Sequence, residues 1–196
     1  MVCKTIIQRF KSAPRLHEPL AALGFMARQL MIWSSGLKYG ISMIISSDYK
    51  DLLRILNKHK VKYLIVGAYA VIYYTEPRYT KDIDIWIEPE EKNAINVYKA
   101  LKEFGAPLKG ITVENFTDKN SVYQIGVEPV RADIIMGLSN IDFDSAWRQK
   151  VVADFDGVNV NVIGRNELIK TKKMSGRSTD RIDIENLGLK LPKKRK

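Results

Sequence analysis

Cysteine and histidine are almost absent from this chain of 196 residues, which contains only Cys3, His17 and His59. A single cysteine excludes a disulfide framework and a cysteine-rich zinc site. The two histidines lie far apart in unrelated sequence contexts, so oxygen ligands remain as the realistic metal chemistry. Oxygen ligands favour Mg²⁺ or Mn²⁺.

Long hydrophobic runs are also lacking. No apolar stretch approaches the roughly 18 residues that a membrane-spanning helix requires, and the run at residues 20–27 ends at Arg28. A basic start followed by an apolar patch imitates a signal peptide, but the positive region is too long and a charge breaks the run. We therefore expect a cytoplasmic protein without a membrane partner.

The first part of the chain has little regular pattern. Pro14 and Pro19 interrupt any early helix, and patterned sequence begins only at Ser47. We predict that residues 1–46 are a basic, poorly organised extension, that residues 47–188 form the functional domain, and that residues 189–196 are a basic tail. In this interpretation Met43 begins the functional part and the preceding residues are non-essential. The alternative is a targeting or membrane-surface helix.

The net charge of +10 suggests a polyanionic partner such as a nucleic acid. Most of the excess lies in the two terminal segments, while the middle of the chain is closer to neutral. For the C-terminal Lys193-Lys194-Arg195-Lys196 we favour the simpler interpretation of a solvated tail.

Hydrophobic periodicity in the organised part alternates between helix and strand patterns. Helices are predicted over residues 48–58, 68–74, 90–104, 143–148, 166–174 and 179–187. Strands are predicted over 63–66, 81–87, 122–127, 130–135, 150–155 and 158–163, and the last two are joined by Asp156-Gly157, which favours a tight hairpin turn. The expected fold class is α+β, a mixed β-sheet with helices packed against it.

Two aspartates lie on the same face of one predicted strand. Residues i and i+2 of a strand point the same way, so Asp82 and Asp84 project together while Ile83 and Ile85 enter the core. Two carboxylates on one face repel each other unless a cation joins them. A pair of this kind can hold Mg²⁺, which keeps positions open for phosphate oxygens.

The segment before the aspartates supports this interpretation. The strand at residues 63–66 ends abruptly at Gly67, and a helix follows at once. Backbone N–H groups at such a helix start favour an anion. Taken alone, Asp-x-Asp is a weak motif and Gly67 is explained by a turn. Their order and spacing indicate a phosphate cradle beside a metal pair.

Gly67-Ala68, thirteen intervening residues, and then Asp82-Ile83-Asp84-Ile85 resemble the signature of the DNA polymerase β-like nucleotidyltransferase superfamily. The similarity is greatest to its small prokaryotic members, which include the nucleotidyltransferase toxins of abortive-infection toxin–antitoxin systems. It covers most of residues 48–187 and none of residues 1–46. One departure is Ala68, where the superfamily usually has serine or glycine, so no hydroxyl is present to contact phosphate.

The resemblance implies a set of functional residues. Asp82, Asp84 and Asp133 are expected to be metal ligands, and Asp133 also to act as general base toward the acceptor hydroxyl. Expected nucleotide-binding residues are Gly67, Ala68, Arg78, Thr80 and Lys172. For the lysine, Lys170 and Lys173 remain alternatives. Asp180-x-x-Asp183 with Gly176-Arg177 is similar to the closing motif of these proteins.

The predicted function is a magnesium-dependent enzyme that transfers NMP from an NTP, ATP among them, to a hydroxyl acceptor. The acceptor is RNA or a tRNA end, a protein, or a small molecule, and a toxin role with an antitoxin partner protein is one option. The alternative is a catalytically weak nucleotidyltransferase-fold module that binds or regulates, which Ala68 favours. A glycosyltransferase using Asp-x-Asp is disfavoured, because such enzymes generally need a larger domain.

Overall fold

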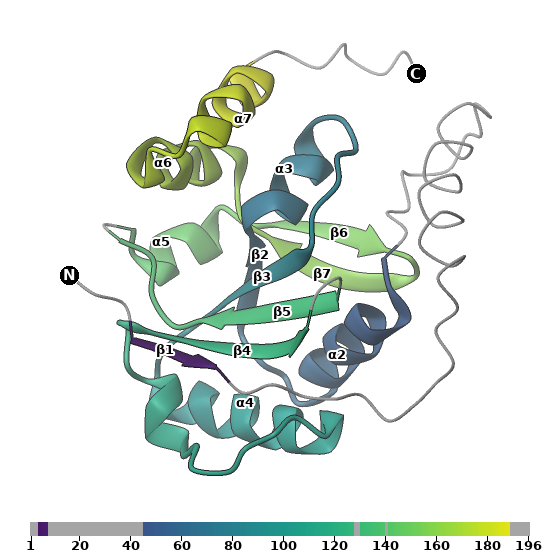
Figure 1. The fold of residues 1–196 in the computed structure, drawn as a ribbon, viewed down its shortest axis with the longest axis vertical. Helices are drawn as coiled ribbons and strands as arrows, with labels where there is room; N and C mark the ends of the chain where they lie inside the picture. The colour runs from purple at the N-terminus through teal and green to yellow at the C-terminus, as the bar shows by residue number, and fades with distance from the viewer. Residues whose placement is uncertain (1–3, 8–44, 128–129, 140, 189–196) are drawn as a thin grey trace.

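One mixed β-sheet organises the computed structural model, which describes residues 4–7, 45–127, 130–139 and 141–188. Within these residues seven strands pair in the order β1-β4-β5-β3-β2-β7-β6. Helices pack on both faces of this sheet (Figure 1). The α+β fold class is therefore confirmed.

The strands are β1 Lys4–Ile7, β2 Tyr63–Val66, β3 Asp82–Ile87, β4 Ser121–Val127, β5 Val130–Ile135, β6 Val151–Phe155 and β7 Val158–Val162. The helices are α2 Ser47–Lys58, α3 Gly67–Tyr74, α4 Glu91–Phe104, α5 Phe143–Arg148, α6 Arg165–Ser175 and α7 Ser178–Gly188, with a short 3-10 helix η1 at Val113–Phe116. Every helix and strand predicted within the organised part is present, and no bound differs by more than one residue.

Local chemistry explains several of these bounds. The Ser46 side chain caps α2 by accepting a hydrogen bond from the Tyr49 N–H. Gly105 ends α4 in the left-handed conformation. Asp156 and Gly157 both have positive φ values, 53° and 80°, as the tight turn between β6 and β7 requires.

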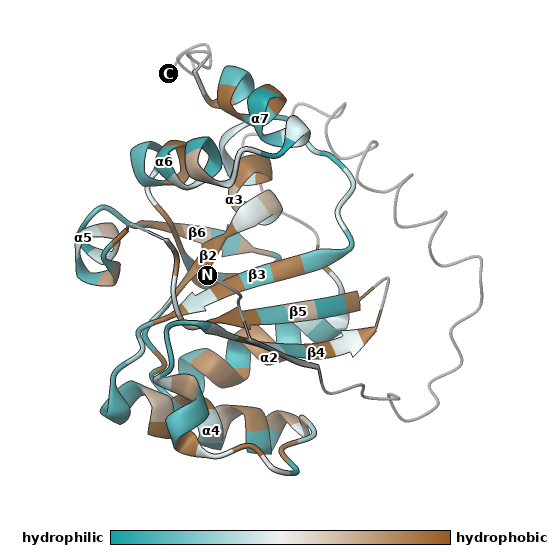
Figure 2. Ribbon diagram, turned by 60° about the vertical axis from the view of Figure 1, so that its left-hand side comes forward, coloured by the Kyte–Doolittle hydropathy of each residue, from teal (hydrophilic) through white to brown (hydrophobic). Residues whose placement is uncertain are grey.

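The central strands position the candidate site. β3 lies between β2, to which it is antiparallel, and β5, to which it is parallel. Ile83 and Ile85 are fully buried, and the alternation of hydrophobic and hydrophilic residues along β3 is visible in Figure 2. Helices α2 and α4 lie against the face that receives these isoleucines, while α3, α6 and α7 lie on the opposite face (Figures 1 and 2).

The predicted N-terminal extension requires a correction at one point. Residues 4–7 were expected to be poorly organised, yet they form strand β1, which pairs in parallel with β4 at one edge of the sheet. The β-branched residues Thr5, Ile6 and Ile7 favour a strand, and β4 offers an unpaired edge. The rest of the predicted extension and the tail lie outside the described residues, so the division into domains stays a prediction. No helix in the described part of the chain is long and apolar enough to cross a membrane.

Candidate active site

Three aspartates meet on one face of two neighbouring strands. In the parallel pairing of β3 with β5, Asp84 lies opposite Asp133 and Asp82 lies opposite Arg131. Residues directly opposite each other in a pair of strands share a face of the sheet. The structure therefore brings together the three carboxylates that the resemblance implied, although they are separated by about fifty residues of sequence.

Arg131 lies among these carboxylates. Its Nε donates to Asp133 Oδ1 at 3.0 Å, and its guanidinium also pairs with the Asp82 carboxylate. Sequence reasoning missed this residue. Its position two residues before Asp133 on a strand was the available signal, because that spacing places both side chains on one face.

Asp84 and Asp133 have perturbed acidities. Burial, followed by the charges of Asp82 and Asp133, raises the pKa of Asp84 to about 6. Burial also raises the pKa of Asp133, against the opposing effects of Arg131 and of the hydrogen bond from Gln124. Negative charge is thus crowded in a partly desolvated place, an arrangement typical of functional sites.

Gly67 places backbone directly against Asp84. It ends β2, begins α3 and has a φ of +61°. A Cβ atom at this position would lie 1.8 Å from Asp84 Oδ2, so only glycine fits. Val66, the N-cap residue of α3, makes no side-chain capping hydrogen bond. Ala68 follows in the first turn of α3 and adds no hydroxyl.

The loop between α3 and β3 carries the two remaining residues predicted from the first motif. The Thr80 hydroxyl donates to Asp82 Oδ1 at 3.1 Å, so this residue contacts the carboxylate group. Arg78 instead pairs with Asp183 of α7 at 3.0 Å. It therefore ties the loop to the C-terminal helix.

Lys172 is the centre of a buried ion-pair network between α6 and α7. Its Nζ lies 2.8 Å from Asp180 Oδ1 and 2.9 Å from Asp183 Oδ2, and both carboxylates are almost fully buried. The charge of Lys172 also opposes the rise in the pKa of Asp84 that burial, Asp82 and Asp133 cause. Of the alternatives, Lys170 pairs with Glu167 and Lys173 is exposed.

Replacing Lys172 with methionine is expected to destabilise the fold by about 2–3 kcal/mol, because two buried carboxylates lose their shared cation. Burial raises the pKa of Asp180, but hydrogen bonds from Lys172 and Ser175 outweigh this effect and lower it. A carboxyl group with a lowered native-state pKa stabilises the fold at pH values above its unfolded-state pKa. This stabilisation is lost as the pH falls through the native-state pKa. Urea unfolding should therefore show a lower free energy of unfolding for Lys172→Met than for wild type near neutral pH. In acid, the two free energies should become similar.

The matched control is Lys173→Met, an exposed position on the same turn of α6. It should unfold at the wild-type urea concentration at every pH. Equal stability of the Lys172 variant and wild type near neutral pH would contradict the proposed contribution of this network.

Tyr49 of α2 supports the carboxylate strands from the other side of the sheet. Its hydroxyl donates to the Arg131 carbonyl at 3.0 Å and accepts from the Arg131 N–H at 3.1 Å. The same oxygen lies 3.4 Å from the Lys81 carbonyl oxygen, at the start of β3. Sequence reasoning missed this contact because 82 residues separate the partners.

Replacing Tyr49 with phenylalanine is expected to cost about 1 kcal/mol of stability, since a buried backbone group loses its partner. Because that group belongs to Arg131, whose side chain pairs with Asp82 and Asp133, any activity that depends on these carboxylates should fall as well. Tyr63→Phe is the matched control: its hydroxyl donates to Asn57, away from the carboxylates. Unfolding and transfer assays on both variants test this. A Tyr49 variant that loses stability but keeps full activity would show a structural role only.

Metal binding is not prearranged in this conformation. Among the described residues, no group of three or more histidine, cysteine, aspartate or glutamate side chains converges on a common metal position. Arg131 bonds Asp82 and Asp133 and compensates part of their charge. Asp84, the most crowded of the three, has no ion-pair partner in the part of the chain that the structure describes.

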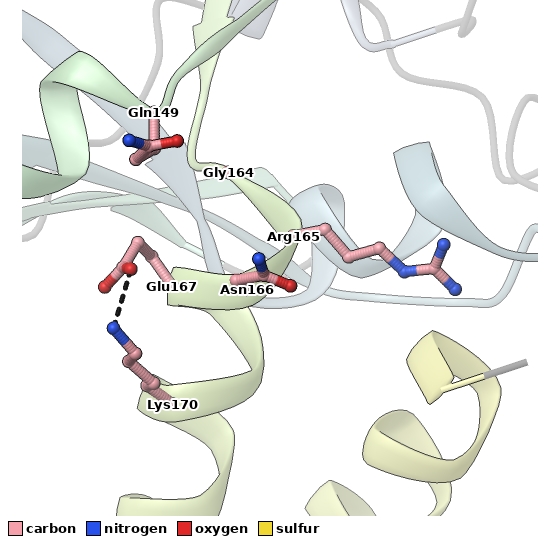
Figure 3. A pocket seen from close by; sticks show the side chains of 6 residues that line it. All are labelled: Gln149, Gly164, Arg165, Asn166, Glu167 and Lys170. Carbon is pink, nitrogen blue, oxygen red and sulfur yellow. Dashed lines mark hydrogen bonds and ion pairs between the residues drawn. The ribbon is translucent and has the colours of Figure 1, made fainter.

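A hollow of about 570 Å³ lies beside the start of α6. It is lined by Gln149, Gly164, Arg165, Asn166, Glu167 and Lys170, as Figure 3 shows. Lys170, an alternative to Lys172 in the sequence analysis, is part of this lining, while none of the other sequence-predicted site residues is. The hollow is nevertheless close to the same end of the sheet, because the Ile163 N–H donates to the Ile65 carbonyl near the end of β2.

No protein-family model matches the chain, and no curated protein matches its sequence. Seven chains of solved structures are similar to it, among them the following two. The lincosamide antibiotic adenylyltransferase LnuA, solved with lincomycin bound, is 16% identical with a TM-score of 0.47, and the match covers 74% of this chain and 98% of that one. A protein from Thermotoga maritima is 15% identical with a TM-score of 0.48, covering 75% and 96%. The second protein carries the name of a nucleotidyltransferase.

Proposed function

We propose that this protein is a divalent-metal-dependent nucleotidyltransferase that moves NMP from an NTP to a hydroxyl acceptor and releases pyrophosphate. One observation carries the proposal: Asp82, Asp84 and Asp133 lie on one face of two adjacent strands, with the Gly67 backbone against Asp84. Transfer of a nucleotidyl group needs positioning and charge neutralisation more than covalent chemistry from the protein. Carboxylates beside a glycine turn at a helix start are suited to both tasks.

The donor set fits Mg²⁺ or Mn²⁺. Carboxylate oxygens are the ligands these ions prefer. Burial and the charges of Asp82 and Asp133 raise the pKa of Asp84, and a bound cation would offset both effects. Asp82, Asp84 and Asp133 would hold the ion, which when bound would neutralise the triphosphate and the departing pyrophosphate. Arg131 pairs with two of these carboxylates, Asp82 and Asp133. It would have to give up part of this pairing when the ion binds.

The other residues have separate tasks in this proposal. The backbone N–H groups at the start of α3, from Gly67 and Ala68, would face the phosphates. Asp133, whose pKa is raised, is a suitable base toward the acceptor hydroxyl. Thr80 holds Asp82 in place. The positive charge of Lys172, held by Asp180 and Asp183, stabilises the ionised form of Asp84.

The acceptor is proposed by class. RNA or a tRNA end, a protein hydroxyl and a small molecule all present the required group, and the net charge of +10 favours a polyanion. A cytoplasmic toxin restrained by an antitoxin protein is the biological setting that the sequence resemblance suggests. ATP is the first NTP to test.

A module that binds nucleotide without transferring it is the second candidate. Two observations favour it: Arg131 already compensates Asp82 and Asp133, and Ala68 offers no hydroxyl to a phosphate. Such a module would bind an NTP with little dependence on a divalent cation.

The test is a transfer assay with the full chain. The protein is incubated with Mg²⁺, with each NTP labelled at the α-phosphate, and with bulk tRNA or cell lysate. Label is expected to enter one acceptor class, to disappear with EDTA, and to be lost in Asp82→Ala/Asp84→Ala. Asp51→Ala, an exposed aspartate of α2, is the control and should transfer normally.

Transfer that survives the double substitution would refute the assigned site. NTP binding without transfer to any acceptor, measured by equilibrium dialysis, would favour the binding module instead.

A further inference from the structure

One guanidinium group bridges the two strands of the candidate active site. Arg131 Nε donates to Asp133 Oδ1 at 3.0 Å, and Arg131 Nη2 donates to Asp133 Oδ2 at 3.3 Å. The same Nη2 atom also pairs with the Asp82 carboxylate of the neighbouring strand. Asp82 lies directly opposite Arg131 in the pairing of β3 with β5, so the register of the sheet brings the two side chains together.

The backbone of Arg131 is fixed, whereas its side chain is partly open. The residue lies in β5, between β3 and β4, and the Tyr49 hydroxyl bonds both its N–H and its carbonyl oxygen. The Arg131 side chain is 28% exposed, so it is not enclosed by the core. The guanidinium can therefore change partners by rotation about side-chain bonds, without a shift of the strand.

The carboxylates remain partly supported when the guanidinium turns away. Gln124 lies opposite Asp133 in the antiparallel pairing of β4 with β5, and its Nε2 donates to Asp133 Oδ2 at 3.2 Å. Asp84, on the other side of Asp133, has no ion-pair partner in the described part of the chain. A divalent ion at this face would thus meet one unpaired carboxylate, and would compete with Arg131 for the other two.

Arginine is suited to carboxylates and to phosphates alike. Its planar fork of N–H donors forms the same two-point contact with either group. If an ion takes the oxygens of Asp82 and Asp133, the guanidinium loses its partners at the place where the ion would also hold a triphosphate. Phosphate oxygens are then the nearest anionic acceptors for Arg131.

We propose that Arg131 is an exchangeable cation of the active site. In the free protein it competes with a divalent ion for Asp82 and Asp133, and in the nucleotide complex its guanidinium contacts the triphosphate. The inference rests on the proposed function and adds a regulation of the same site. The ion is held weakly by the free protein and tightly only when a nucleotide engages Arg131.

Two binding measurements on the full chain test the proposal without any acceptor. The electron paramagnetic resonance signal of free Mn²⁺ gives the affinity for the ion alone. Equilibrium dialysis in saturating Mg²⁺ gives the affinity for α,β-methylene-ATP, in which a methylene group replaces the oxygen at the bond that transfer would break. Arg131→Gln removes the charge, and Arg54→Gln, at an exposed position of α2, is the matched control.

Mn²⁺ is expected to bind Arg131→Gln about tenfold more tightly than wild type, because two partly exposed ion pairs no longer compete for the carboxylates. The ATP analogue should bind the same variant about tenfold more weakly, through the loss of a charge-assisted contact with phosphate. Arg54→Gln should change neither affinity. Partial unfolding of Arg131→Gln would weaken both, so opposite shifts identify an exchange of partners in a folded protein.

Arg131→Lys separates the guanidinium contacts from the effect of charge alone. Lysine keeps the positive charge but pairs as a point charge and lacks the fork. Mn²⁺ should therefore bind this variant about threefold more tightly than wild type, and the analogue about threefold more weakly. The variant also provides the test if Arg131→Gln does not fold, because it retains a cation among the carboxylates.

Three results would overturn the proposal. Equal Mn²⁺ affinity of Arg131→Gln and wild type would show that the guanidinium does not compete with the ion. Unchanged binding of the analogue would show that Arg131 does not turn to the triphosphate. An Arg131→Lys protein identical to wild type in both measurements would attribute the effects to charge alone.

The transfer assay distinguishes these failures from a failure of the proposed function. Normal transfer by wild type, with neither affinity shifted in Arg131→Gln, would refute only the exchange. Both affinity shifts in the absence of transfer to any acceptor would support the exchange and refute the proposed transfer.

Discussion

Replacing Asp84 with asparagine is expected to abolish nucleotide transfer and to make the metal-free protein more stable at neutral pH. Burial and the charges of Asp82 and Asp133 raise the pKa of Asp84 to about 6. The native state therefore binds this proton more tightly than the unfolded chain, so stability falls as the pH rises from about 4 to about 6. Above that range the ionised carboxylate costs about 1–3 kcal/mol, which a neutral amide avoids.

Urea unfolding in EDTA, from acid to slightly alkaline pH, measures this effect. The stability difference between variant and wild type should grow between about pH 4 and pH 6 and then remain constant. Transfer activity should fall by at least about 10²–10³-fold, because removing one preorganised charge-stabilising group from an active site typically lowers the rate by this factor. Asp51→Asn, at an exposed site, should change neither property. A variant less stable than wild type at neutral pH would contradict the crowding of charge inferred for this site.

Gly67→Ala is expected to be the most damaging single substitution in the carboxylate region. The added Cβ would lie 1.8 Å from Asp84 Oδ2 and 2.7 Å from its Cγ, and the residue has a φ of +61°. Left-handed strain and steric overlap together should cost about 2–5 kcal/mol. Because the Asp84 carboxylate must move to relieve the overlap, transfer should be lost even at temperatures where the variant is folded.

Two further variants separate the causes. Gly110→Ala has a similar φ, +75°, but nothing within 4 Å of the new Cβ, so it should cost only about 1–2 kcal/mol. Adding Asp84→Ala to Gly67→Ala removes the atoms in conflict and should recover the steric part of the stability, although not the activity. Thermal unfolding of wild type, Gly67→Ala, Asp84→Ala and the double variant completes the cycle. If the double variant recovers no stability, the Gly67–Asp84 contact is not the source of the loss.

Helices and strands could be predicted from the sequence because their signals are local. The alternation from Asp82 to Ile87 and the Asp-Gly turn at residues 156–157 depend on neighbouring residues alone. Strand β1 was missed because its four residues lie at the edge of the sheet. A short edge strand is specified by the partner it meets more than by its own pattern.

The candidate site could be predicted only in part. The period of two placed Asp82 and Asp84 together, and the resemblance pointed to Asp133. The spacing of Arg131 from Asp133 indicated only a shared strand face. The pairing of Arg131 with Asp82, and the contact of Tyr49 with the Arg131 backbone, had no counterpart in any short motif. For Arg78, a phosphate-binding role was implied, whereas the structure pairs it with Asp183. Its role in nucleotide binding therefore stays a prediction.

By itself, the sequence determined which segments of the organised part are strands and helices and that two aspartates share a strand face, since both follow from backbone periodicity. Tertiary structure alone decided that Asp133 lies opposite Asp84, that Arg131 compensates the carboxylates, and that Lys172 is held by two buried aspartates. These arrangements depend on strand register and helix packing between segments tens of residues apart. Register is set by how the whole core packs, because a shift of one residue would turn every side chain of a strand to the other face.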